Sequence, residues 1–161
     1  MAASLAPVKG KQTGRKALYL LAAGALLGAF GCDPVNGAAV EVSWVVHTPG
    51  GFAIDDCSCA DPAIAEVRLL LTPQSGTESA RSYDFPCKKQ RGVTPFEVPV
   101  GLYELQVQAL DAQGQPAAGA VAPPPFVKRL VWGQPASMDA QLIVASCASR
   151  CANKNGTCKA Q

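Results

Sequence analysis

Cysteine is the residue type with the most definite chemistry in this chain, which has seven cysteines among 161 residues. Six of them follow residue 56: Cys57, Cys59, Cys87, Cys147, Cys151 and Cys158. The seventh, Cys32, stands alone near the start of the chain. An even set of cysteines is typical of a disulfide framework, and disulfides persist in oxidising compartments outside the cytosol. We therefore predict three disulfides among the six later cysteines.

The spacing of these cysteines restricts how they can pair. Cys57 and Cys59 are two residues apart, which is too close for ordinary disulfide geometry. The C-terminal tail holds three cysteines, so at least one of them must pair with the body of the protein. We expect Cys87 to pair with Cys57 or Cys59, the other of these two to pair with a tail cysteine, and Cys151 to pair with Cys158. Other connectivities stay open.

The same cysteines are also candidate metal ligands. A site could combine Cys57 and Cys59 with His47, or it could use the three tail cysteines. The acidic side chains near the first pair, Asp55, Asp56 and Asp61, could add oxygen ligands. The spacing has neither the paired C-x2-C pattern of structural zinc sites nor the D-x-D-x-D-G pattern of calcium loops. Disulfides are therefore favoured, with no cofactor and no metal, and a protein that binds a metal or an anion through the loop of Cys57 and Cys59 is the alternative.

Residues suited to catalysis are scarce. The single histidine, His47, ends a predicted strand on its polar side, where we expect a solvated group. Two short basic clusters, at residues 88–91 and 128–129, are typical of solvated sheet edges. Catalysis by a nucleophile or a general base usually needs a positioned histidine or a tuned pair of carboxylates. We therefore predict no catalytic residue and no enzymatic activity.

The first 31 residues have the pattern of an export signal. Four basic residues between positions 9 and 16 precede an apolar run of 14 residues, 17–30. A helix of that length covers about 21 Å, less than the roughly 30 Å of a bilayer core. A basic flank, a short apolar core and small residues at its end are typical of a cleaved secretory signal. Without the leader, 10 basic and 12 acidic side chains give a charge of about −2, which favours no nucleic-acid partner.

The end of this leader, Ala29-Phe30-Gly31-Cys32, resembles the lipobox of bacterial lipoproteins. In that family the leader is cut before the cysteine, and the sulfur of the cysteine is diacylated. The resemblance implies that Cys32 carries the lipid and that the protein is anchored to a membrane of the bacterial cell envelope. Ala29-x-Gly31 also fits ordinary signal peptidase, which would release a soluble protein. Lipidation is favoured because it leaves an even number of cysteines to pair.

Short segments of alternating apolar and polar residues follow the leader. In residues 103–109 every odd position is apolar and every even position is polar, which is typical of a half-buried strand. Similar alternation predicts strands over residues 40–47, 67–72, 83–87, 126–132 and 138–144, with a weaker one over 96–98. The segments between them are rich in Pro and Gly. The predicted fold class is all-β, a single antiparallel sandwich of about seven strands, with Trp44 and Trp132 packed in its core or against its edge.

Two motifs flank the strand predicted over residues 103–109. Pro99-Val100-Gly101-Leu102-Tyr103 opens it, and Asp111-Ala112-Gln113-Gly114 follows it. They resemble the entry and exit of a strand in fibronectin type III, transthyretin-like and other immunoglobulin-like domains. The resemblance implies that glycine supplies a special backbone angle and that the Tyr103 hydroxyl ties down the preceding corner. It carries no activity, because this fold supports many functions.

The sequence thus predicts four segments. They are a signal peptide (1–31), a lipid-anchored linker (32–38), a β-sandwich (39–146) and a cysteine-rich tail (147–161). We expect a non-catalytic lipoprotein of the cell envelope, on the inner or the outer membrane, with a protein or glycan as its partner.

Overall fold

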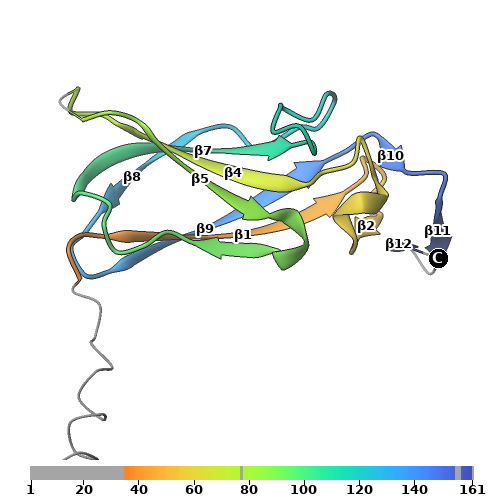
Figure 1. Ribbon diagram of the computed structural model, residues 1–161, viewed down its shortest axis with the longest axis horizontal. Helices are drawn as coiled ribbons and strands as arrows, with labels where there is room; N and C mark the ends of the chain where they lie inside the picture. The colour runs from red at the N-terminus through yellow and green to blue at the C-terminus, as the bar shows by residue number, and fades with distance from the viewer. Residues whose placement is uncertain (1–34, 77, 155–156, 161) are drawn as a thin grey trace, which may run out of the picture. The chain divides into compact units, whose positions relative to one another are not determined.

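Strands with one apolar face form two larger sheets and one small sheet (Figure 1). The computed structural model describes residues 35–76, 78–154 and 157–160. These residues belong to one compact unit, Val35–Gln161. The expected signal peptide and Cys32 lie outside the described residues.

The largest sheet is built around β1 (Ala39–His47). β9 (Pro135–Ile143) pairs with β1 in parallel over nine residues, and β6 (Arg91–Val93) pairs with β1 in antiparallel orientation. The other three strands of this sheet continue past the end of β1: β2 (Ala53–Ile54), β12 (Thr157–Ala160) and β11 (Cys151–Lys154).

The second sheet has four strands, which are all antiparallel. Their order is β5 (Arg81–Pro86), β4 (Glu66–Pro73), β7 (Gly101–Leu110) and β8 (Phe126–Leu130). The small sheet pairs β3 (Ala60–Asp61) with β10 (Ser146–Cys147). Two short 3-10 helices follow β2 and β5: η2 (Cys57–Cys59) and η3 (Cys87–Lys89). None of the helices in the described part of the chain has the length and hydrophobicity needed to cross a bilayer.

One hydrophobic core joins the two larger sheets. Val42 and Trp44 of β1 belong to the same buried cluster as Leu69 of β4 and Leu105 of β7. These side chains come from one face of each strand, because successive residues of a strand point to opposite faces. Burying each of the large ones contributes about 1.5 to 3 kcal/mol relative to leaving it in water.

The prediction of a mostly β fold with disulfides is confirmed, but the arrangement of the strands differs from the prediction. The described residues form twelve strands in three sheets, and the longest pairing of the first sheet, β1 with β9, is parallel. Alternation reports which face of a strand is buried and says nothing of the direction of its neighbour. The prediction of a weak strand over residues 96–98 is also wrong. Only Val98 makes a bridge there, to Ala38, and the neighbouring strand is β6.

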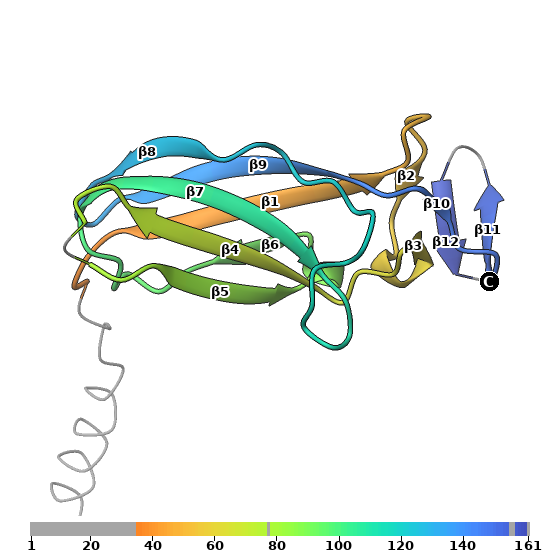
Figure 2. The same cartoon turned by 90° about the horizontal axis from the view of Figure 1, so that it is seen from above.

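The two ends of this unit are formed by different segments of the chain. The described chain begins at Val35, beside the turn between β8 and β9, and β10 to β12 lie at the opposite end with the C-terminus (Figure 2). β1 and β9 connect the two ends. Nine residues of extended chain span about 26 Å, so groups at the two ends cannot touch the same small ligand.

Tyr103 ties down a different loop from the one that the immunoglobulin-like resemblance implies. Its ring is buried, and its hydroxyl donates a hydrogen bond to Glu78 Oε2 at 2.8 Å. Glu78 belongs to the segment between β4 and β5, so the bond fastens that loop and not the corner before Tyr103. Burial, followed by the bond to Glu78, raises the pKa of Tyr103 to about 12.

We expect Tyr103→Phe to lower the free energy of unfolding by about 1 kcal/mol at pH 7, because it removes one hydrogen bond and keeps the ring. The pKa of Tyr103 is raised on folding from 10.0 to about 12. The stabilisation is therefore complete below pH 10 and is lost as the pH rises through about 12. Urea unfolding of both proteins at pH 7 and above pH 10 measures this difference. An equal difference at all pH values would contradict the assigned bond.

Candidate functional site at the disulfide-linked end

The six later cysteines gather at the end of the unit opposite to Val35. We call this the far end, and it comprises η2, η3, β3 and β10 to β12 (Figure 1). Three disulfides join its segments: Cys57–Cys87, Cys59–Cys151 and Cys147–Cys158. Their loops differ in length, with sequence separations of 30, 92 and 11 residues. The longest one ties the tail to the body.

The helix η2 explains how Cys57 and Cys59 reach different partners. Asp56 caps this helix by accepting a hydrogen bond from Ser58 N at 2.9 Å. A 3-10 helix has about three residues per turn, so side chains two residues apart point in directions about 120° apart. Both cysteines are buried. Cys57 bonds to Cys87 at the start of η3, and Cys59 bonds to Cys151 at the start of β11.

Part of the predicted pairing is confirmed and part is wrong. Cys87 bonds to one of the two neighbouring cysteines, and the other of them bonds to the tail, as expected. The expected bond between Cys151 and Cys158 does not form. In the hairpin of β11 and β12 the residue opposite Cys151 is Ala160, so the two cysteines are not paired across the strands. Cys158 bonds to Cys147 instead.

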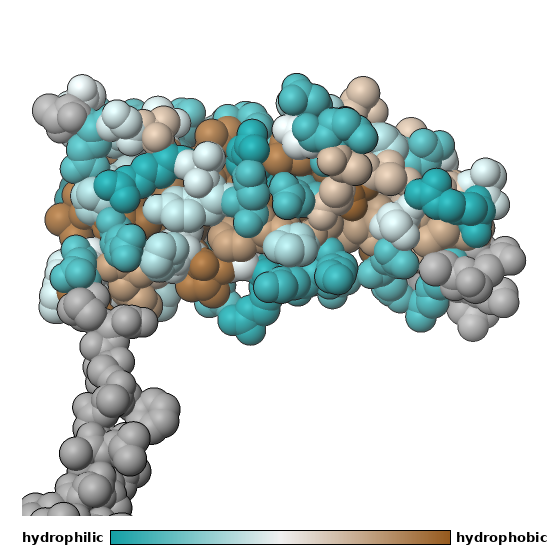
Figure 3. Space-filling view, in the orientation of Figure 1, coloured by the Kyte–Doolittle hydropathy of each residue, from teal (hydrophilic) through white to brown (hydrophobic). Residues whose placement is uncertain are grey.

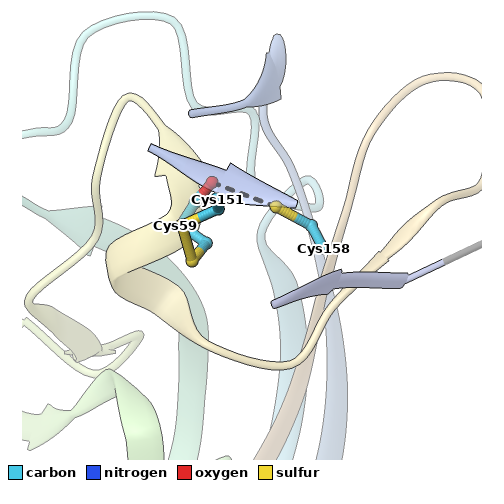
Figure 4. A group of neighbouring side chains, drawn as sticks. All are labelled: Cys59, Cys151 and Cys158. Carbon is cyan, nitrogen blue, oxygen red and sulfur yellow. Dashed lines mark hydrogen bonds between the residues drawn. A yellow bond between two sulfur atoms is a disulfide. The ribbon is translucent and has the colours of Figure 1, made fainter. Parts of the chain in front are cut away.

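Three sulfur atoms lie close together where the two tail disulfides meet. The Sγ atoms of Cys59, Cys151 and Cys158 are within 4.8 Å of one another (Figure 4). Cys158 Sγ is also 3.4 Å from the backbone carbonyl oxygen of Cys59. All three sulfurs are in disulfides, and the ligand that binds a metal is the thiolate. The trio therefore packs as a cluster of disulfide sulfurs, with Cys59 and Cys158 buried and Cys151 half-buried, as long as the bonds are intact.

The acidic residues beside the cysteines do not converge on one point. Asp55 forms an ion pair with Lys159 at 3.1 Å, Asp56 caps η2, and Asp61 accepts a hydrogen bond from Ser146 Oγ at 3.3 Å. Each carboxylate thus has its own partner. Among the described residues, none of these acids belongs to a group with metal-ligand spacing.

The basic residues and the histidine are spread over the surface of the unit. Arg91 forms an ion pair with Glu41 at 2.6 Å, and Lys128 Nζ donates to the carbonyl oxygen of Ser137 at 2.6 Å. Lys88 and Lys89 are exposed on η3. His47 is half-buried, with Nδ1 3.0 Å from the carbonyl oxygen of Thr48. Lys88 and Lys89 thus follow the disulfide-bonded Cys87 on η3, while Arg91, Lys128 and His47 each have a partner elsewhere in the unit.

An open pocket of about 410 Å³ lies at the far end. It is lined by Thr48, Pro49, Gly50, Phe52, Ala145, Ser146 and Cys147. Phe52 supplies its only aromatic ring and is 44% exposed. Cys147 is in a disulfide, so none of these lining residues can act as a general acid or base. The pocket offers apolar packing and two hydroxyl groups, which suits binding rather than proton transfer.

Of two exposed aromatic residues, Phe52 was missed as a candidate contact in the sequence, and Trp132 was considered for ligand contact only as the alternative to packing in the core. Phe52 follows a Pro-Gly-Gly turn, outside every alternating segment, so periodicity gives no signal for it. Trp132 was expected in the core or against its edge, and this is wrong, because it is 63% exposed. Its position next to Gly133-Gln134-Pro135, in a turn, is the signal that could have placed it outside. The expectation is confirmed for Trp44, whose Nε1 donates to Cys87 O at 2.9 Å.

The surface of the described unit shows hydrophilic and hydrophobic residues side by side (Figure 3). On the outer face of the four-stranded sheet, Arg68 Nε donates to Asp84 Oδ1 at 2.7 Å, and this bond lowers the pKa of Asp84.

Comparison of the sequence with models of protein families and with curated proteins found no match.

Proposed function

We propose that this protein is a bacterial cell-envelope lipoprotein, anchored to its membrane by fatty acyl chains on Cys32. The observation that carries the proposal is the set of three disulfides, one of which joins residues 92 positions apart. Such a framework suits a chain that has left the reducing cytosol. The leader supplies the export signal, and its lipobox-like end supplies the site of the anchor.

We further propose that the body is an immunoglobulin-like sandwich with an added tail. In support, the antiparallel order β5-β4-β7-β8 faces the sheet of β6, β1 and β9 through a shared core. The motif that ends β7 also fits. Asp111 Oδ1 accepts hydrogen bonds from Gln113 N and Gln115 N, each at 2.9 Å, and Gly114 has a φ of 73° that favours glycine. β10, β11 and β12 are then the addition that the disulfides hold in place.

The role of the sandwich in this proposal is to present its far end to a protein or glycan partner without catalysis. The far end lies past the end of β1, a strand that spans about 26 Å from Ala39 to His47. It carries the Phe52 pocket, one wall of which ends at Cys147 and is held by the Cys147–Cys158 disulfide. An apolar pocket whose lining includes two hydroxyl side chains is suited to a side chain or a sugar ring.

Intact mass spectrometry of the protein purified in detergent from its native host tests the anchor. The expected mass is that of residues 32–161 with three disulfides and the acyl chains on Cys32. An unmodified amino terminus or an uncut leader would contradict the proposal.

Thiol titration of the same sample, denatured and not reduced, tests the alternative of a metal- or anion-binding protein. No free thiols are expected. Four or more thiols would favour a metal centre, because the sulfur trio of Cys59, Cys151 and Cys158 can ligate a metal only after its bonds are reduced.

A further inference from the structure

Exposed apolar side chains gather at the end of the unit where the described chain begins. We call this group the near-end patch, and it consists of Val35, Val100, Val131 and Trp132, which are between 39% and 63% exposed. These residues come from three separate parts of the chain. Isolated exposed apolar residues are common on proteins, so their grouping is the informative feature.

Backbone pairing holds the patch together. Gly101, the first residue of β7, pairs with Leu130, the last residue of β8, so Val100 just before β7 and Val131 just after β8 extend from the same end of this pair. The turn that contains Trp132 is closed by a bond from Gln134 N to Val131 O at 3.2 Å. Gly133 N donates to Gly37 O at 2.9 Å, which fixes this turn beside the segment that starts at Val35.

The charge near the patch includes one cation without an acidic partner. Arg129 is exposed and pairs in register with Leu102, and among the described residues no carboxylate forms an ion pair with it. Glu97 is exposed at the same end, so the patch is not a strongly basic surface. Its main character is apolar, with one aromatic ring. Two guanidinium groups lie at this end, those of Arg129 and of Arg81, whose Nη1 donates to the carbonyl oxygen of Glu97 at 3.3 Å.

The short stretch of chain between the patch and the proposed anchor indicates that the lipid headgroup layer covers the patch. Cys32 precedes Val35 by three residues, and three residues of extended chain reach at most about 11 Å. If Cys32 carries the acyl chains, the headgroup layer lies within that reach of Val35. Tryptophan is enriched at this layer in membrane proteins, because its ring is apolar and its N–H is polar. Arginine there can pair with lipid phosphate.

We infer that the near-end patch rests on the surface of the bilayer, with the ring of Trp132 in the headgroup layer. The inference rests on the proposed anchor at Cys32. Contact at this end orients the unit, because β1 and β9 then lead away from the membrane and hold the far end out. A tether of three residues alone would leave the orientation free.

Quenching of tryptophan fluorescence by brominated lipid tests the contact. The full lipidated protein is reconstituted in vesicles of phosphatidylethanolamine and phosphatidylglycerol that contain lipid brominated near the headgroup. The protein has two tryptophans, Trp132 on the surface and Trp44 in the core. We expect the native protein to lose most of the emission of Trp132, and Trp132→Phe, in which only Trp44 emits, to lose almost none.

The matched control moves the reporter to the far end. Phe52 is exposed there, so Phe52→Trp combined with Trp132→Phe gives a second exposed tryptophan, and we expect little quenching of it. Equal quenching at the two positions, or none at Trp132 in protein that floats with the vesicles, would overturn the inference and leave the anchor intact. Protein that does not float and has no lipid on Cys32 would overturn both.

Discussion

Replacing Cys59 and Cys151 together by alanine is expected to lower the free energy of unfolding by about 5 kcal/mol, since their bond closes the longest of the three loops. In the loop-entropy model a crosslink stabilises the folded protein by restricting the unfolded chain, and the gain grows with the logarithm of the loop length. The separation of 92 residues therefore gives this bond the largest expected contribution of the three to the free energy of unfolding. Denaturant unfolding without reductant, followed by tryptophan fluorescence, measures the loss.

The other two disulfides are matched controls for this prediction. The same model gives about 4 kcal/mol for the pair Cys57 and Cys87, with a separation of 30 residues, and about 3 kcal/mol for Cys147 and Cys158, with a separation of 11 residues. Each double alanine variant leaves no free thiol behind. If the loss for Cys147 and Cys158 were the largest, chain entropy would not be the main contribution of these bonds.

The burial of strand faces could be predicted from the sequence because it depends on local alternation. Tyr103, Leu105 and Val107 lie on one face of β7 and are buried, as their spacing indicates. Val45 interrupts the alternation of β1, and it is 56% exposed because its position points outward. Period two thus overrides the hydrophobicity of a single residue when neighbouring positions are anchored in a core.

The pairing of strands could not be predicted in the same way, because it depends on contacts between distant residues. β1 and β9 are about 90 residues apart in the sequence, and their parallel pairing leaves no mark on either segment. β6 is only three residues long and contains Gly92, so it has no alternation to detect. Gly92 is nonetheless required there, since a Cβ atom at this position would collide with the ring of Phe85.

The presence of disulfides at the far end could be predicted from the sequence, but their pairing could be predicted only in part. Cysteine parity indicates disulfides, and the odd number in the tail indicates a bond to the body, which Cys59 and Cys151 form. The choice of Cys147 as the partner of Cys158 depends on the register of β11 and β12, which the spacing of cysteines does not contain. The exposure of Phe52 and Trp132 depends likewise on where turns are held in space.

Replacing Cys32 by alanine is expected to move the protein from the membrane fraction of its native host to the soluble fraction. Each buried CH2 group of an acyl chain contributes about 0.8 kcal/mol to membrane binding, and two chains together anchor a protein stably. The near-end patch cannot replace them. Burial of one large apolar side chain contributes about 1.5 to 3 kcal/mol, which changes a partition coefficient by roughly 10-fold to 200-fold. Fractionation followed by immunoblotting measures the change.

Two control variants test whether a change in membrane partition results from the loss of the Cys32 thiol. Phe30→Ala alters the leader two residues before Cys32 and keeps the thiol, so this variant should stay in the membrane fraction. The Trp132→Phe variant keeps the anchor and should also stay there, because the patch orients the unit and does not hold it on the membrane. If Cys32→Ala protein with a cut leader remained fully bound to the membrane, another contact would be the anchor, and the role assigned to Cys32 would be wrong.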